Sequence, residues 1–233
     1  PAAMGLPLGE GRAQLLAPVT WLPWQAFVAL WTALTLAACW SLARRWALPL
    51  LLFLPIPFEV VSGNVHLLIA LAVVAGFRHP AVWAFILLTK ATPGIGLVWF
   101  AVRREWRSLG IALAATAAVV AVSVVLAPGE WPAWIRSLAA NAGGPGATLG
   151  WYLPVPLLVR LPLAAALVAW GGITDRRWIV PIAVILALPV VWLNSLAILI
   201  ALVPLLRERR PIASAPDLPA ESGSGSVGWV RLL

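Results

Sequence analysis

The chain has 233 residues, of which 62% are hydrophobic and only 10% charged. A soluble globular domain is closer to half apolar and a quarter charged, so this composition excludes one. The single cysteine, Cys39, excludes a disulfide framework and a cysteine-based metal centre. The two histidines and eight acidic residues are scattered, so we expect neither a metal site nor a cofactor.

The net charge of +8 comes from short arginine clusters between long apolar segments. This pattern orients membrane proteins, with basic loops on the cytoplasmic side. A nucleic-acid-binding protein would instead carry a continuous basic face. We therefore predict an all-α, polytopic helical membrane protein that contacts membrane lipids and no nucleic acid.

Residues 1–20 are mixed in character and are expected to form a loop outside the bilayer. A first membrane span is expected over Trp21–Ala43. The following apolar block, Trp46–Phe77, would be about 48 Å long as one straight helix. That exceeds the hydrocarbon core of about 30 Å, so this block must break. Its middle carries the residues that favour a break, namely Pro55, Pro57, Glu59, Gly63, Asn64 and His66.

Four further segments follow in chain order. Pro80–Val102 carries Lys90 and a Thr-Pro-Gly sequence near its centre, and Gly110–Leu126 is an uncharged span. Trp131–Ala140 is expected to form a short interfacial helix, because its tryptophans suit the membrane–water boundary. Trp151–Trp170 is predicted to be another span.

The last apolar block, Trp178–Leu206, is predicted to break around Pro189–Ser195. The remaining residues, 207–233, are rich in proline, serine and glycine and are expected to form a disordered cytosolic tail. Residues 1–206 would then form one transmembrane domain that lacks its N-terminal spans.

The broken blocks allow more than one orientation. If every block crosses the membrane once, the arginine clusters alternate between its two sides. If the three broken blocks are hairpins of short helices, all the clusters lie inside and the hairpin tips lie toward the outer face. Irregular backbone at membrane depth occurs where it lines a cavity, so this second arrangement predicts a polar cavity near the outer leaflet. Mixed arrangements also satisfy most of the charges.

Three ionisable residues lie well inside apolar blocks: Glu59, Lys90 and Arg160. Each costs about 2.5–3.5 kcal/mol to insert, so each is expected to face a cavity or a partner. Lys90 would hold a phosphate or form an ion pair with Glu59. Arg160 would pair internally or contact a lipid phosphate. Glu59 would act as a base or, as we favour, as a pairing partner.

Several other polar or aromatic side chains suit sugar recognition. His66 lies at a predicted hairpin tip, where it would bond to a sugar hydroxyl, transfer protons or make an interhelical hydrogen bond. Asn64, Asn194 and Tyr152 offer hydrogen-bond donors and acceptors, and Trp192 offers a face on which a pyranose ring can stack.

The order of four motifs carries a resemblance over residues 15–210. They are Leu16-Ala-Pro-Val-Thr-Trp21-Leu-Pro23, Ser62-Gly-Asn-Val-His66-Leu-Leu68, Lys90-Ala-Thr-Pro93 with the Arg/Trp loop 103–107 after it, and Pro189-Val-Val-Trp192-Leu-Asn194-Ser195. In this order they resemble the bacterial polyprenyl-phosphate-mannose-dependent alpha-mannosyltransferases of the GT-C glycosyltransferase superfamily.

The resemblance implies a GT-C-like fold in the bacterial cytoplasmic membrane. Such enzymes move mannose from a polyprenyl-phosphate donor to a glycolipid or glycan acceptor on the extracytoplasmic side. By this resemblance Lys90 would contact the donor phosphate, while Asn64, His66 and Asn194 would line the sugar pocket. The family's catalytic aspartate is expected upstream of Pro1. The chain departs from the family at His66, where asparagine is common, and at Asn194, where histidine is common.

Two other functions remain open from the sequence. One is a transporter or flippase-like protein for a lipid-linked or small polar substrate, which an inverted internal repeat would favour. No such repeat is found. The other is a catalytically inactive homologue that serves as a membrane scaffold.

Overall fold

The computed structural model describes residues 22–142 and 155–207. Every regular element in this part of the chain is a helix, so the predicted all-α class is confirmed. Among the described residues, two helices are long and apolar enough to cross a membrane, and a bent helix pair counts as a third if it forms one span. The sequence predictions for residues 1–20, Trp21, Tyr152 and residues 208–233 of the tail lie outside the described residues.

The first long helix matches the predicted first span. Helix α2 covers Trp24–Ala43, and a short 3-10 turn, η2 (Arg44–Trp46), connects it to α3 (Ala47–Leu50). Together they form a 27-residue apolar segment. Its long run of apolar side chains suits a lipid environment. Lipid offers no hydrogen-bond partners, so each backbone N–H and C=O must bond within the segment, which a helix achieves.

The block after α3 breaks where its glycine and polar residues predict. Helix α4 (Pro55–Ser62) ends at Gly63, whose φ of 62° lies in the left-handed region that glycine adopts without a steric penalty. Helix α5 (His66–Gly76) follows, and the two axes differ by 110°. The chain therefore turns back at this point.

The other two predicted breaks are also confirmed. The 3-10 turn η3 (Pro80–Val82) and helix α6 (Trp83–Thr89) lead to Lys90, which has an extended backbone. The 3-10 helix η4 (Thr92–Leu97) and helix α7 (Val98–Val102) follow. The last block consists of α11 (Ile179–Leu186), an irregular stretch, η6 (Leu193–Ala201) and α12 (Leu202–Arg207).

Three unbroken helices complete the fold. Helix α8 (Trp106–Leu126) is the second span-length helix, and α9 (Glu130–Ala142) contains the short helix predicted over 131–140. Helix α10 (Leu157–Ile173) matches the described part of the predicted Trp151–Trp170 span and packs against α7 and α11.

Close packing around one tryptophan holds the second and third blocks together. Trp83 is fully buried and lies against Gly76 and Gly96, where an added β-carbon would come within 2.5 Å and 2.2 Å of the indole. Its ring also meets Phe100 edge to face, with the centroids 6.3 Å apart. Helices α5, α6 and α7 and the η4 segment are thereby fixed relative to one another.

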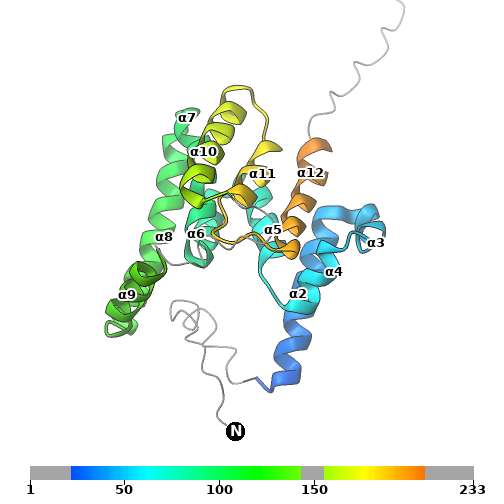
Figure 1. Ribbon diagram of the computed structural model, residues 1–233, viewed down its shortest axis with the longest axis horizontal. Coiled ribbons are helices and arrows are strands. Elements are labelled where there is room, and N and C mark those ends of the chain that lie inside the picture. Colours follow the sequence, from blue (N-terminus) through cyan, green and yellow to red (C-terminus); the bar gives the residue numbers. More distant parts are fainter. Residues whose placement is uncertain (1–21, 143–154, 208–233) are drawn as a thin grey trace, which may run out of the picture.

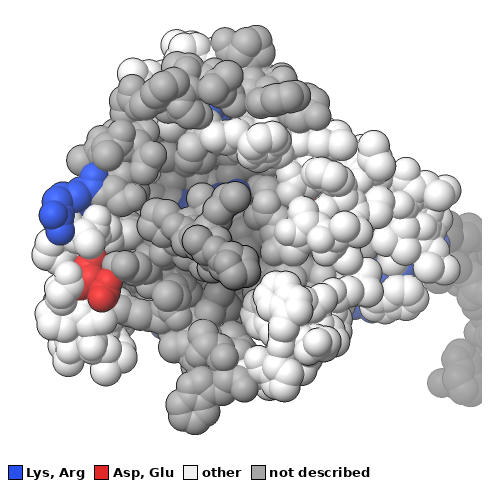
Figure 2. Space-filling view, turned by 60° about the horizontal axis from the view of Figure 1, so that its bottom comes forward, with Lys and Arg blue, Asp and Glu red and all other residues white. Residues whose placement is uncertain are grey.

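The three broken blocks each begin and end at the same end of the molecule. Arg44, Arg78 and Arg207 line one cavity, Arg177 stacks on Phe77, and Arg103 bonds to the carbonyl of Gly172. The arginine clusters therefore gather at one end, which we call the basic end and which lies at the top of Figure 1. Over the described part of the face turned forward in Figure 2, uncharged atoms predominate. This is the arrangement that hairpins predict.

Candidate functional site

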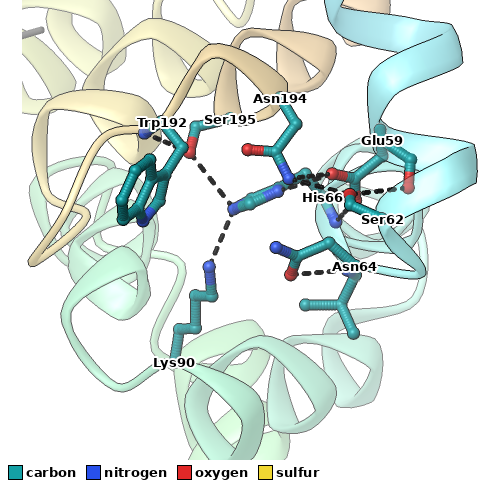
Figure 3. Close-up of polar contacts among 9 residues, drawn as sticks. Glu59, Ser62, Asn64, His66, Lys90, Trp192, Asn194 and Ser195 are labelled. Atoms are coloured by element: carbon teal, nitrogen blue, oxygen red, sulfur yellow. Dashed lines mark hydrogen bonds and ion pairs between the residues drawn. The ribbon is translucent and has the colours of Figure 1, made fainter. Parts of the chain in front are cut away.

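The three chain breaks bring polar side chains together inside the molecule. Glu59 comes from α4 and His66 from the start of α5, Lys90 follows α6, and Asn194 and Ser195 lie at the start of η6 (Figure 3). Glu59, His66 and Ser195 are fully buried, and Asn194 is 3% exposed. We call these five residues the break cluster.

The Glu59 carboxylate is the centre of the hydrogen bonds in the break cluster. One oxygen accepts the backbone N–H of His66, and the other lies 2.9 Å from both the Nδ1 of His66 and the Nδ2 of Asn194. A buried carboxylate requires such donors, because an unpaired charge is costly in an apolar interior. Glu59 is therefore held by three protein donors, which agrees with the pairing role that we favoured from the sequence.

His66 lies between Glu59 and Lys90. If Nδ1 donates to the carboxylate, Nε2 carries the lone pair and can accept a hydrogen bond. The Nζ of Lys90 lies 2.7 Å from this nitrogen, and the Ser195 hydroxyl lies 3.3 Å from it. The carboxylate thus fixes the imidazole tautomer, and the imidazole positions the ammonium group. Lys90 and Glu59 are connected through His66 in place of the direct ion pair that we considered.

Unpartnered polar atoms lie beside the break cluster. The Nδ2 of Asn194 donates to Glu59 and, at 3.2 Å, to the Ser62 hydroxyl, while its Oδ1 is buried and has no hydrogen-bond partner. The Thr92 hydroxyl and the Trp31 indole N–H are likewise buried and unpartnered. Thr92 follows Lys90 by two residues, and the Trp31 indole lies against Gly63 at the α4–α5 break. Buried polar atoms are rarely left unsatisfied, so these three atoms each keep an unmade hydrogen bond among the described residues.

Two other residues that were predicted to contact a sugar, Asn64 and Trp192, lie near the break cluster but do not belong to it. The Oδ1 of Asn64 accepts the N–H of Val65 at 3.0 Å just before α5 begins. Trp192 is 46% exposed, and its backbone N–H donates to the Ser195 hydroxyl. Figure 3 shows its ring at the edge of the cluster. Tyr152 lies outside the described residues.

Arg160 does not join the break cluster. Its guanidinium donates to the carbonyls of Val155, Leu186, Leu188 and Pro189 at 2.7–3.1 Å. The last three carbonyls belong to the end of α11 and to the stretch after it. Carbonyls at a helix end have no partner within the helix, so they need an outside donor such as Arg160. Arg160 therefore makes the internal contacts that were one of its two predicted roles.

Sequence reasoning did not select four polar residues at this site: Trp31, Ser62, Thr92 and Ser195. Ser62, Thr92 and Ser195 lie within one or two residues of residues that were selected, at the same breaks. A rule that takes all polar side chains at a break would have found them. Trp31 lies in an ordinary apolar span, and nothing in the sequence distinguishes it from the other tryptophans.

The break cluster suits a ligand that is both anionic and rich in hydroxyl groups. The cluster contains the ammonium group of Lys90 and the unpartnered amide oxygen of Asn194, and beside it lie the unpartnered Thr92 hydroxyl and the half-exposed Trp192 side chain. Within residues 22–142 and 155–207, no three histidine, cysteine or acidic side chains lie close enough together to hold a metal ion.

Comparison with known proteins identifies the family. The model of glycosyltransferase family 87 matches residues 11–215, which is most of the chain. The chain belongs to this family. Membership indicates a membrane glycosyltransferase, which acts on a sugar donor and an acceptor. No protein in the curated set and no solved structure matches the chain significantly.

Family membership confirms the coarser part of the sequence resemblance. The glycosyltransferase family and the apolar, span-length helices together support a membrane glycosyltransferase.

Proposed function

We propose that this family 87 glycosyltransferase transfers a hexose, expected to be mannose, from a polyprenyl-phosphate donor to a glycolipid or glycan acceptor. The reaction would take place on the extracytoplasmic side of the bacterial cytoplasmic membrane. The observation that carries the proposal is the Lys90 ammonium group. It is held at the junction of three helix breaks, beside a buried and unpartnered amide oxygen.

The orientation follows from charge. Lys90 lies at a chain break, whereas the arginine clusters occupy the basic end. The positive-inside rule assigns the basic end to the cytoplasm. The break cluster then lies toward the outer leaflet, where a lipid-linked donor can reach it from the bilayer without leaving the membrane.

The chemistry explains why a cation is needed. In the transfer, an acceptor hydroxyl oxygen bonds to C1 of the sugar while the bond between C1 and the phosphate oxygen breaks. The lipid phosphate leaves with additional negative charge, and the hydroxyl proton passes to a base. A preorganised ammonium group stabilises the charge that develops on the leaving phosphate. Lys90 would supply it, held in position by His66 and Glu59.

The other residues have supporting roles in this proposal. The Oδ1 of Asn194 would accept a sugar hydroxyl, Asn64 would offer its amide nitrogen, and the Trp192 ring would stack on the sugar face. Glu59 already accepts hydrogen bonds from three donors, so we assign it the role of positioning His66. A group other than Glu59 would then take the proton of the acceptor hydroxyl.

A transfer assay with Lys90 variants tests the proposal. The full-length protein is reconstituted in proteoliposomes with mannosyl-phosphoryl-polyprenol and a glycolipid acceptor. We expect Lys90→Ala to lower the transfer rate by about 10²–10³-fold, the usual effect of removing one group that stabilises developing charge. Lys90→Arg should retain part of the rate. Arg104→Ala removes the same charge at the basic end and should leave the rate within about twofold.

The outcomes separate the competing functions. A transfer rate that is unchanged in Lys90→Ala, with the protein still folded, contradicts the assignment of Lys90. Transfer from a nucleotide sugar in place of the lipid donor contradicts the proposed donor. Movement of the lipid-linked sugar across the bilayer without transfer would identify a flippase. If neither transfer nor movement occurs, an inactive scaffold is the remaining function.

A further inference from the structure

A second polar site lies at the basic end, away from the break cluster. A cavity of about 410 Å³ lies where the end of α2, the turn after α5 and the end of α12 meet. Its polar lining consists of Ser41, Arg44, Arg78, His79 and Arg207. We call it the basic-end pocket. Its residues come from three segments that lie far apart in the sequence, so helix packing has gathered them.

The charge of the basic-end pocket is unusual for this protein. None of the described residues that line it is acidic. Three guanidinium groups that face one cavity can bond together to a single bound anion. The positive-inside rule explains arginines at this end, but it does not explain their convergence on one cavity.

The basic-end pocket also has an apolar wall. Leu42, Val74 and Pro204 line it beside the arginines. The cavity lies next to the last turn of α2, which belongs to a segment long enough to span a membrane. The ends of spanning helices lie at headgroup level, so the arginines would meet the headgroups and the apolar wall would meet the upper acyl chain.

We propose that the basic-end pocket binds a phosphate group, carried by the headgroup of an anionic phospholipid of the cytoplasmic leaflet. Basic pockets between membrane helices on this side commonly bind such headgroups. The guanidinium groups would bond to the phosphate oxygens in charge-assisted pairs, with Ser41 as an additional donor. A free phosphate ion would satisfy the same arginines but would leave the apolar wall without a partner. This inference does not depend on the proposed transfer reaction.

Lipid titration of the full chain tests the proposal. The protein is purified in a neutral detergent, and bound lipid is counted by native mass spectrometry. The probes are dioleoylphosphatidylglycerol, dioleoylphosphatidylcholine and inorganic phosphate. We expect phosphatidylglycerol to bind at least about tenfold more tightly than phosphatidylcholine, the ratio that about 1.4 kcal/mol of charge-assisted bonding gives.

Two double variants with equal loss of charge localise the site. Arg78→Gln with Arg207→Gln should weaken phosphatidylglycerol binding by about tenfold or more, whereas Arg104→Gln with Arg107→Gln should change it less than about twofold. Thermal unfolding of each variant shows whether it is folded. Arg44→Gln is a third, independent variant that should also weaken binding if the first pair unfolds.

The possible results are distinct. Equal weakening in both double variants indicates general attraction between charges and overturns the proposal. Unchanged binding in the pocket variants also overturns it. Binding of inorganic phosphate at the same arginines without phosphatidylglycerol binding keeps the phosphate site and overturns the lipid as its carrier.

Discussion

At the residue scale, Glu59 and His66 form one functional unit. The carboxylate accepts the backbone N–H of His66 and lies 2.9 Å from the imidazole Nδ1, so replacing either side chain removes the same contact between carboxylate and imidazole. We expect Glu59→Gln to destabilise the protein by about 1–3 kcal/mol, because an amide group places a donor against the donors of His66 and Asn194. Denaturant titration in detergent micelles measures this loss.

Coupling between the two residues provides the decisive comparison. Because the interaction is shared, the loss in the double variant Glu59→Gln/His66→Ala should be smaller than the sum of the two single losses by 0.5 kcal/mol or more. Ser62→Ala is the control, since it removes the 3.2 Å contact with Asn194 and the bond that the Ser62 hydroxyl donates to the Glu59 backbone carbonyl, but leaves the contact between the Glu59 and His66 side chains intact. Losses that add within about 0.3 kcal/mol would show that Glu59 and His66 act independently.

At the element scale, Arg160 connects α10 to the chain break that follows α11. Three of its hydrogen bonds go to the carbonyls of Leu186, Leu188 and Pro189. Arg160→Met keeps an unbranched apolar stem in place of the arginine stem but leaves these carbonyls without a donor. We expect a loss of about 2–3 kcal/mol in the free energy of unfolding. Arg160→Lys should recover only part of it, because an ammonium group lacks the planar fork of a guanidinium.

The same variants distinguish the two roles that the sequence allowed for Arg160. A structural role predicts that Arg160→Met lowers the melting temperature and that the surviving folded protein keeps its KM for the lipid-linked donor. A raised KM at an unchanged melting temperature would instead assign Arg160 to lipid phosphate binding.

The helix breaks were predictable from the sequence, but the partners of the buried charges were not. An apolar block too long for the bilayer, with glycine, proline and charge at its centre, has few alternatives to breaking. Glu59 and Arg160 were recognised as needing partners for the same reason. Their partners depend on tertiary packing: Asn194 lies 135 residues from Glu59, and the carbonyls that Arg160 contacts carry no sequence signal.

At the scale of the whole molecule, the folding of the three broken blocks determines on which side each loop lies. Single crossings would place residues 78–79 outside, whereas the structure puts the arginine clusters at one end. Cysteine labelling tests this in a Cys39→Ala background. Ala81→Cys and Thr174→Cys lie at exposed positions near the basic end, and Gly129→Cys lies at an exposed position just after α8.

In intact cells, a membrane-impermeant maleimide should label Gly129→Cys and should reach the other two only after permeabilisation. The physical reason is the positive-inside rule, which keeps the arginine-rich loops in the cytoplasm. Ala81→Cys is the discriminating site, because its labelling from outside would require the Trp46–Phe77 block to cross the membrane once. In that case the basic end would not exist as a single surface in the membrane, and the basic-end pocket could not form.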